Sequence, residues 1–281
     1  MSWPAPAKIN LFLHVIGRRS DGYHLLQTVF RFLDIHDSLR FTPREDGQVV
    51  RATALPGVSP EQDLTLRAAR VLQVASRVTQ GVTIAVDKQL PIGGGLGGGS
   101  SDAATTLLAL NHLWDCRLSR NALAEIGLTL GADVPVFIHG LSAFGEGVGE
   151  KLTPVKLPPA WYLVLVPPVT VSTAEIFSAA DLKRDTPAVA PQDWLAGAFA
   201  KPGINDLEAV TCNRYPEVAR HLAWLRGLAG TPDAAMSGSG ACCFAGFATE
   251  AAAQSAYRQM PRDMRGFVAQ GLDLHPLSAL T

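Results

Sequence analysis

Apolar side chains recur along the first half of the chain with two different periods. Period-two alternation or a continuous apolar run marks residues 7–15, 25–32 and 82–86, and both patterns are typical of strands. Residues 63–76 instead carry apolar side chains at the spacing of one helical face. The apolar positions of this helix are Leu64, Ala68, Val71, Leu72 and Ala75. We therefore expect strands and helices to alternate here.

The first half ends in segments that interrupt regular structure. We expect a helix that follows Ser119, a good N-cap residue, and ends at Gly131. Residues 132–135, Ala-Asp-Val-Pro, are not expected to continue it as regular helix, because proline lacks the N–H group that a helix interior requires. Residues 145–149 carry three glycines and are expected to form a turn.

Prolines cluster within residues 154–159, and we place a domain boundary near residue 155. It divides the chain into an N-terminal domain, residues 1–155, and a C-terminal domain, residues 156–281. In the second domain we expect strands near 162–166, 241–247 and 267–271, and helices near 206–212, 216–228 and 249–259. Together the two halves indicate an α+β protein.

The most informative segment is residues 91–105, which read Pro-Ile-Gly-Gly-Gly-Leu-Gly-Gly-Gly-Ser-Ser-Asp-Ala-Ala-Thr. Glycines allow a backbone to approach a ligand closely and leave its N–H groups free to converge on an anion. Ser100 and Ser101 are expected to cap a following helix, whose N-terminus also favours negative charge. Its expected apolar face is Ala103, Leu107, Leu110 and Trp114. The segment therefore predicts a phosphate-binding loop.

A flexible linker is the alternative interpretation of these glycines. Linkers are usually polar on both sides, whereas here a strand precedes the loop and an amphipathic helix follows it, so we favour a binding site. The loop lacks the P-loop pattern, and its spacing does not fit a dinucleotide fingerprint on a parallel βαβ unit. Both of those common nucleotide folds are therefore disfavoured.

Charge and cysteine content narrow the class of partner. The chain has 281 residues and a formal net charge of −1, with no basic run, which argues against nucleic acid or a membrane surface as partner. The longest candidate for a signal peptide, residues 9–16, is too short, and no apolar stretch is long enough to span a membrane. The four cysteines have no Cys-x-x-Cys spacing, so we interpret them as reduced thiols of a cytoplasmic protein. A small molecule is the expected partner.

Three further groups of residues are candidates for chemistry. On the first strand, Lys8 and Asn10 share one face, and a buried lysine needs an anionic partner unless it reaches solvent at an edge. Tyr23 and His24 follow an Asp-Gly turn; they either serve the turn alone or offer a flat heteroaromatic ligand an aromatic face and imidazole hydrogen bonds. Residues 237–240, Ser-Gly-Ser-Gly, are either a hairpin turn or a second loop that closes over a polyphosphate.

Taken together, residues 6–11 (Pro-Ala-Lys-Ile-Asn-Leu), the 91–105 loop, residues 131–135 (Gly-Ala-Asp-Val-Pro) and residues 237–240 resemble the ordered motifs of the GHMP kinase superfamily. The resemblance covers nearly the whole chain. It implies an N-terminal domain of the ribosomal-S5 type, a C-terminal ferredoxin-like domain and an active site in the cleft between them. It also implies an ATP-dependent, Mg²⁺-requiring kinase acting on an alcohol.

Within the superfamily, Arg18, Tyr23, His24 and the ending Gly-Phe-Val-Ala-Gln-Gly at 266–271 resemble the branch whose substrate is a cytidine diphosphate of methylerythritol, a small molecule of isoprenoid precursor synthesis. The resemblance implies that Asp133 and Lys8 are catalytic and that Asn10 holds the sugar alcohol. It implies that Tyr23, His24 and Phe177 contact the cytosine.

The resemblance further implies that one set of residues binds ATP, with Lys88 near the adenosine. These residues are Lys88, Pro91, Ile92, Gly93, Gly94, Gly95, Leu96, Gly97, Gly98, Gly99, Ser100, Ser101, Ser237, Gly238, Ser239 and Gly240. The ligands of Mg²⁺ are not assigned, although Ser101 and Glu146 are candidates and Asp102 could serve only the helix dipole. Asp63 is left out, because it replaces an asparagine near the adenine.

Two questions stay open. A sister kinase acting on another alcohol, or a nucleotide-binding module without turnover, would share the glycine loop; the presence of both Lys8 and Asp133 argues against the module. The sequence also does not decide whether Asp133 removes the hydroxyl proton as a general base or mainly orients the hydroxyl. The oligomeric state is not predicted.

Overall fold

The computed structural model describes residues 1–55, 57–197, 204–231 and 233–280. Its strands are β1 (Trp3–Arg18), β2 (His24–Arg44), β3 (Val49–Arg51), β4 (Gly81–Asp87), β5 (Ala143–Gly147), β6 (Lys151–Pro154), β7 (Trp161–Leu165), β8 (Ala235–Met236), β9 (Cys243–Phe247) and β10 (Gly266–Leu272). Its helices are α1 (Leu64–Ser76), α2 (Gly98–Leu113), α3 (Arg120–Leu128), α4 (Val134–His139), α5 (Thr173–Ser178), α6 (Pro191–Gly197), α7 (Glu208–Arg214), α8 (Pro216–Gly227) and α9 (Glu250–Arg258). The α+β prediction is confirmed.

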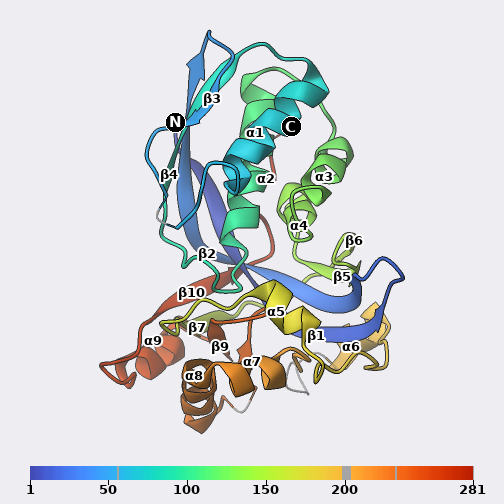
Figure 1. Cartoon of the computed structure of the whole chain (residues 1–281). Coiled ribbons are helices and arrows are strands. Elements are labelled where there is room, and N and C mark those ends of the chain that lie inside the picture. Colours follow the sequence, from blue (N-terminus) through green and yellow to red (C-terminus); the bar gives the residue numbers. More distant parts are fainter. Residues whose placement is uncertain (56, 198–203, 232, 281) are drawn as a thin grey trace.

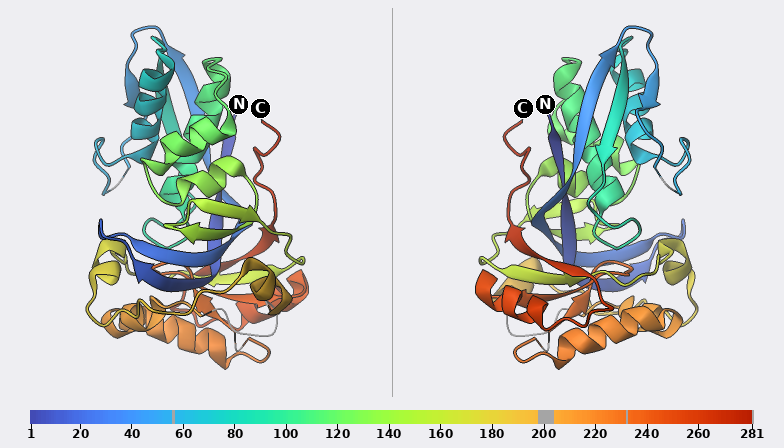
Figure 2. Two further views of the ribbon diagram at one scale, coloured as in Figure 1. Left: turned by 90° about the vertical axis from the view of Figure 1, so that its right-hand side faces the viewer. Right: turned by 90° about the vertical axis from the view of Figure 1, so that its left-hand side faces the viewer.

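The long antiparallel strands β1 and β2 run through both halves of the molecule (Figure 1). The sheet has the order β3-β4-β2-β10-β7-β9-β8, with β1 paired to β2 and with β5 joining β2 to β6. Helices α1 to α4 pack on one side of the sheet around β3 and β4 and form the N-terminal lobe (Figures 1 and 2). Helices α8 and α9 pack on β7 and β9, and α5 to α7 complete the C-terminal lobe (Figure 1). Residues in the middle of β1 therefore lie where the lobes meet.

Each lobe has its own hydrophobic core. The first includes Phe32, Leu107 and Phe137, all fully buried, and the second includes Leu163 and Val218, also fully buried. Burying such side chains stabilises each by about 1.5–3 kcal/mol relative to exposure, before chain entropy is considered. A third buried cluster, which includes Ile9, Leu96 and Val164, packs β1 and the glycine loop against β7 and so joins the two lobes.

Helix α2 differs from the expectation at its start. The N-cap position is held by Gly97, with φ of +72°, and no side chain caps the helix. Ser100 and Ser101 lie in its first turn, so the prediction that they cap it is wrong. A glycine in the left-handed region turns the chain into the helix without a capping side chain, and the first N–H groups are left unbonded by the helix itself. The predicted apolar face is buried.

Other boundaries differ for local reasons. Helix α3 begins after Ser119, as predicted, but ends at Leu128 instead of Gly131. Pro135 lies in the first turn of α4, where its missing N–H costs nothing, so residues 132–135 start a helix that the sequence analysis missed. Residues 143–147 form β5 before the turn, and the expectation of a turn over all of 145–149 is wrong in its first half.

In the C-terminal lobe the predicted elements are confirmed as β7, β9, β10, α7, α8 and α9. The chain end then returns to the N-terminal lobe, so that both termini lie on this lobe (Figures 1 and 2). The Arg120 guanidinium donates hydrogen bonds to the carbonyl groups of Leu277, Ser278 and Leu280. The domain boundary near residue 155 stays a prediction. A boundary there assigns the last residues to the C-terminal domain, whereas they pack on the N-terminal lobe.

Candidate active site

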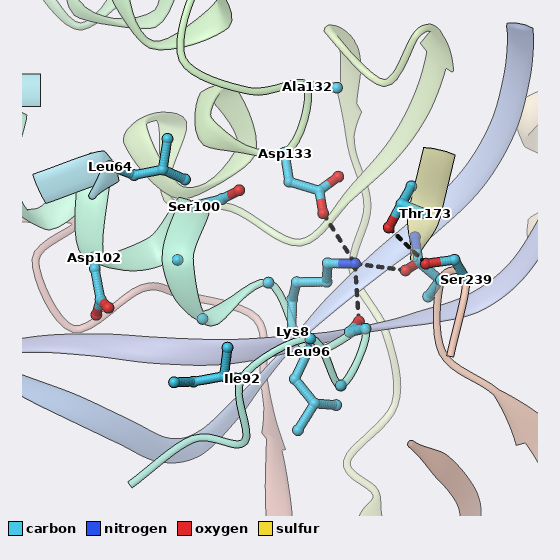
Figure 3. Close-up of a pocket in the computed structure, with 18 of the residues that line it drawn as sticks. Lys8, Leu64, Ile92, Leu96, Ser100, Asp102, Ala132, Asp133, Thr173 and Ser239 are labelled. Atoms are coloured by element: carbon cyan, nitrogen blue, oxygen red, sulfur yellow. Dashed lines mark hydrogen bonds and ion pairs between the residues drawn. The ribbon is translucent and has the colours of Figure 1, made fainter. Parts of the chain in front are cut away.

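A cavity of about 570 Å³ opens where the two lobes meet. The glycine loop forms one wall, and the middle of β1 and the turn before α4 form another. Further lining residues come from the start of α1, from α5 and from the turn at residues 238–239. Segments far apart in the sequence therefore surround one space. Figure 3 shows the side chains around Lys8 and Asp133 in this cavity.

The carbonyl groups of the glycine loop are turned towards the protein. The Gly94 carbonyl accepts a hydrogen bond from the Cys242 N–H at 3.0 Å, and the Leu96 carbonyl accepts one from the Lys8 N–H at 2.9 Å. The Gly95 carbonyl accepts bonds from Lys8 Nζ at 3.2 Å and from Ser237 Oγ at 2.9 Å. These bonds hold the loop with its carbonyl groups turned towards the protein. The N–H groups at the N-terminus of α2, which have no partner within the helix, lie at the cavity.

Two glycines of the loop are required by close contacts. At Gly95, with φ of +75°, a Cβ atom would lie 2.1 Å from the Ser237 carbonyl oxygen. At Gly97 it would lie 3.0 Å from both Cε of Lys8 and Cζ of Phe137. The first contact joins the loop to the Ser-Gly-Ser-Gly turn, and the second joins it to β1 and α4. No side chain could be placed at either position without displacing these elements.

Lys8 and Asp133 form an ion pair at the centre of the cavity (Figure 3). Lys8 Nζ lies 3.1 Å from Asp133 Oδ2 and donates to Asn10 Oδ1 at 2.6 Å. The Asn10 amide donates in turn to Thr28 Oγ1 at 2.9 Å. The lysine side chain is only 3% exposed, so its charge has the anionic partner that burial demands, and the alternative of an edge lysine that reaches solvent is excluded.

Asp133 occupies the N-cap position of α4, yet its side chain makes no capping hydrogen bond. Its carboxylate is 32% exposed and faces the cavity, where it contacts Lys8. The structural role of a helix cap therefore does not account for this carboxylate. An ionised group held in reach of a cavity and of a buried ammonium is placed to interact with a polar ligand.

A second buried charge cluster lies under the start of α2. Lys88 Nζ is paired with Asp37 and lies 2.8 Å from Asp102 Oδ2. Asp37 also accepts hydrogen bonds from the N–H groups of Gln89 and Leu90, whereas Asp102 Oδ1 has no hydrogen-bond partner among the described residues. Burial, opposed by Lys88, raises the pKa of Asp102 to about 7. Lys88 and Asp102 line the cavity; Asp37, which supports them, carried no sequence signal.

The aromatic candidates are only partly brought together. Phe177 of α5 lines the cavity, and its ring lies 5.0 Å from that of His24, between centroids. Burial and the charges of Arg184 and Arg18 lower the pKa of His24. Tyr23 lies in the predicted turn with 64% of its surface exposed, and it does not line the cavity.

Among the remaining candidates, Gly238 and Ser239 line the cavity, whereas Ser237 and Gly240 support it from behind. Ser101 is buried and Glu146 accepts a hydrogen bond from Gln27, so neither Mg²⁺ candidate faces the cavity. Asp63 does line it, but Thr65 and Arg51 occupy its oxygen atoms. The sequence analysis also missed apolar lining residues, Leu13, Leu26, Leu55 and Val58, which no motif marked.

Comparisons with known proteins agree with this geometry. The family model of the GHMP kinases N terminal domain matches residues 63–141, and that of the GHMP kinases C terminal matches residues 195–266. A mevalonate kinase crystal structure superposes with a TM-score of 0.69 at 14% identity, over 97% of this chain and 99% of that one, which shows a shared fold. The fold is thus that of the GHMP kinases.

Two comparisons are more specific. The chain is 60% identical over 279 residues to the 4-diphosphocytidyl-2-C-methyl-D-erythritol kinase of Dechloromonas aromatica (strain RCB), covering 99% of this chain and 100% of that protein. A crystal structure of 4-(cytidine 5'-diphospho)-2C-methyl-D-erythritol kinase superposes with a TM-score of 0.82 at 35% identity, over 96% of this chain and 99% of that one. The chain therefore belongs to the family of 4-diphosphocytidyl-2-C-methyl-D-erythritol kinases.

Proposed function

We propose that this chain uses ATP to phosphorylate the 2-hydroxyl group of 4-diphosphocytidyl-2-C-methyl-D-erythritol. The observation that carries the proposal is the position of the Lys8–Asp133 pair. It lies in the same cavity as the glycine loop and the N-terminus of α2. A phosphate donor and an alcohol bound there would meet beside one ammonium and one carboxylate. That arrangement suits transfer of a phosphoryl group.

The ATP phosphates bind at the loop. The N–H groups of Gly98, Gly99 and Ser100 begin α2, and the helix dipole favours negative charge there by about 0.3–1 kcal/mol for each charge. The nucleoside lies towards the start of α1, where Leu55, Val58 and Leu64 supply apolar surface. This position of the nucleoside is supported by the shape of the cavity, which extends from the glycine loop to Leu55, Val58 and Leu64.

The alcohol lies at the Lys8 end of the cavity. Asp133 either takes the proton of the 2-hydroxyl as a general base, which typically raises the rate by about 10²–10⁴-fold, or orients that hydroxyl. In the second case the proton leaves only late in the transfer. Lys8 stabilises the charge that develops on the transferred group, and Asn10 holds Lys8 and contacts the sugar alcohol. The cytosine lies towards Phe177 and His24, with Tyr23 as a further contact that requires movement of its turn.

Mg²⁺ fits the donor set of the cavity. Magnesium in kinases is usually held by the substrate phosphates together with one or two carboxylates. Asp133 and Asp102 are carboxylates that line the cavity, and Asp102 Oδ1 has no partner among the described residues. A bound ion would neutralise negative charge on the phosphates.

An ADP-release assay tests the proposal directly. Purified protein is given ATP, Mg²⁺ and either 4-diphosphocytidyl-2-C-methyl-D-erythritol, mevalonate, homoserine or galactose, with the Asp133→Asn variant as control. We expect turnover with the first alcohol alone. Turnover with another alcohol would indicate a sister kinase, and nucleotide binding without any turnover would indicate a binding module.

Base selectivity provides a second test. CDP is expected to bind better than UDP, because the two bases differ in donor and acceptor at one edge and a site built for one leaves a polar group unpaired with the other. The double variant His24→Ala, Phe177→Ala should abolish the preference. Equal affinity of the unmodified protein for CDP and UDP would contradict the proposed base site.

We also propose a cytoplasmic location. All four cysteines are free thiols in the structure, and burial raises the pKa of Cys242 to about 12, which keeps this thiol unreactive. Among the described residues, none of the helices has the length and apolar character needed to cross a membrane. The number of copies in the active assembly is left open.

A further inference from the structure

Arg184 binds to one nitrogen of the His24 ring and to the backbone around α5. Its Nε–H donates to His24 Nε2 at 3.0 Å. Its other nitrogen atoms donate to the carbonyl oxygens of Leu182 at 2.9 Å, Phe177 at 3.1 Å and Ala179 at 2.6 Å. Four acceptors therefore hold the planar guanidinium in one orientation. Arg184 itself does not line the cavity.

The direction of the bond to His24 is fixed by chemistry. A guanidinium has only donors and is always charged, so Nε2 of His24 must accept and cannot carry a proton. The ring proton must then lie on Nδ1. Burial and the charges of Arg184 and Arg18 lower the pKa of His24, which keeps the ring neutral at neutral pH. Among the described residues none hydrogen-bonds Nδ1, so this N–H is free to meet a ligand.

We propose that Arg184 fixes His24 as the Nδ1–H tautomer and thereby makes the ring a hydrogen-bond donor that selects cytosine over uracil. This inference rests on the proposed function, since it takes His24 to face the base. His24 does not itself line the cavity, but its ring lies 5.0 Å from that of Phe177, between centroids and tilted by 35°, and Phe177 does line it. The His24 ring therefore lies beside the space that the base would occupy. Arg184 is a positioning residue, because it acts only through His24.

The two bases respond differently to a fixed donor. Cytosine N3 is an acceptor, whereas uracil N3 carries a proton and would face the Nδ1–H as a second donor. Without Arg184 a neutral imidazole in water prefers the other tautomer, with its proton on Nε2, and Nδ1 would become an acceptor. Loss of Arg184 should therefore weaken CDP binding and favour UDP binding, instead of weakening both.

Nuclear magnetic resonance reports the tautomer itself. The full chain is labelled with ¹⁵N-histidine and recorded at pH 7.5, with His24→Asn used to identify the His24 signals. We expect a protonated Nδ1 and an unprotonated Nε2 in the unmodified protein, and a shift towards protonated Nε2 in Arg184→Met. A protonated Nε2 in the unmodified protein would overturn the proposal, whether or not any variant folds.

A matched control separates this effect from loss of structure. Arg214 donates to the Glu175 carbonyl and pairs with Asp181, so it supports the same α5 segment without touching His24. Arg214→Met should leave the His24 tautomer unchanged. Arg184→Lys keeps a charged donor and should retain the Nδ1–H form. If Arg214→Met changed the tautomer as much as Arg184→Met, Arg184 would be merely one support of α5.

Calorimetric titration with CDP and UDP supplies the functional readout. We expect Arg184→Met to lower the CDP-to-UDP affinity ratio by about tenfold or more, the usual effect of one buried polar mismatch. In a His24→Asn background the same substitution should leave the ratio unchanged. A ratio that survives Arg184→Met would overturn this inference alone, whereas an unmodified protein without any preference for CDP would contradict the proposed function.

Discussion

The Nζ atom of Lys8, on β1, lies 3.1 Å from Oδ2 of Asp133, in the turn before α4. Lys8 is buried, and Asn10 and the Gly95 carbonyl accept its remaining hydrogen bonds. Asp133 keeps one side of its carboxylate towards the cavity. The pair thus links β1, the strand that runs through both lobes, to the turn before α4, and both residues line the cavity.

Replacing Asp133 by Asn tests this relationship. The amide keeps the shape of the side chain and could cap α4 equally well, but it loses the charge and basicity. We expect kcat to fall by at least about 10²-fold with little change in either KM. Lys8→Met should be comparably damaging. Steady-state kinetics of the folded variants measures both effects, and near-normal kcat in Asp133→Asn would overturn the catalytic assignment.

The double variant provides a stricter check. Because Lys8 and Asp133 contact each other, their losses should not be independent. The variant with both substitutions is expected to lose much less than the product of the two single losses in kcat. Multiplicative losses would show that the two residues act separately on the reaction.

The glycine loop predicts a specific loss of nucleotide binding. Gly97→Val would place a branched side chain 3.0 Å from Lys8 and Phe137, in a backbone conformation that valine rarely adopts. We expect a raised KM for ATP and lower turnover, with CDP binding largely intact. Gly230 is a matched control, because its φ of +83° imposes the same strain, a Cβ atom there meets no neighbour within 4 Å, and it does not line the cavity. Equal ATP kinetics in both variants would argue against the phosphate site.

The Lys88–Asp102 cluster predicts a dependence of stability on pH. The folded pKa of Asp102, about 7, lies above its ordinary value of 3.8, so the folded state binds more protons between these values. Stability from this group is present below 3.8 and is lost as the pH rises towards 7. Asp102→Asn should therefore gain stability relative to the unmodified protein between pH 5 and pH 8, by several degrees in Tm.

Thermal unfolding at the two pH values measures this change. Asp115→Asn, which removes an exposed partner of Arg117, is the control and should show a nearly constant difference. If the Tm difference of Asp102→Asn were also constant, the carboxyl would titrate as in the unfolded chain. Both measurements are made without nucleotide and Mg²⁺, because the proposed function places Mg²⁺ beside Asp102.

For His275 we expect the stability to change with pH in the opposite direction. It is buried in the returning chain end, its Nδ1 accepts the Leu277 N–H, and burial lowers its pKa from 6.5 to about 3. Stability from this group is present above pH 6.5 and is lost as the pH falls, by up to about 1.4 kcal/mol per pH unit. His275→Asn keeps an acceptor but does not titrate, so its urea midpoint should fall less between pH 6.5 and 4.5. His36→Asn, at an exposed position, is the control. If the urea midpoint of His275→Asn fell as steeply as that of the unmodified protein, the lowered pKa of His275 would be contradicted.

The sequence was most informative where a local pattern carries its own physical reason. The helix of residues 63–76, the strand of residues 82–86 and the elements of the C-terminal lobe follow from periodicity, and Ser119 caps α3 as its residue type predicts. Six glycines before a helix predict a phosphate site, because only a backbone without side chains allows so close an approach. The expectation that this helix is amphipathic is wrong, since α2 is buried continuously from Ser101 to Asn111. Lys8 and Asp133 became candidates together through the resemblance of their motifs.

Elsewhere a local rule was overruled by the surroundings. Ser100 and Ser101 are good caps by residue type, but the close approach of Lys8 and Phe137 requires a glycine at position 97, and the helix begins there instead. Pro135 was taken to interrupt structure, whereas the first turn of α4 accepts it. Such choices depend on neighbours distant in sequence, which a periodic pattern does not contain.

The sequence by itself determined the class of the fold, the glycine-rich loop that predicts a phosphate site and the residue types that carry charge. Only the tertiary structure decided which charges meet: Asp133 with Lys8, Asp37 with Lys88, and Arg184 with His24. The physical reason is that secondary structure follows from interactions within a few residues. Which buried charges pair instead depends on how whole lobes pack. A charge removed from water needs an opposite charge nearby, and packing is what brings a residue distant in the sequence close to it.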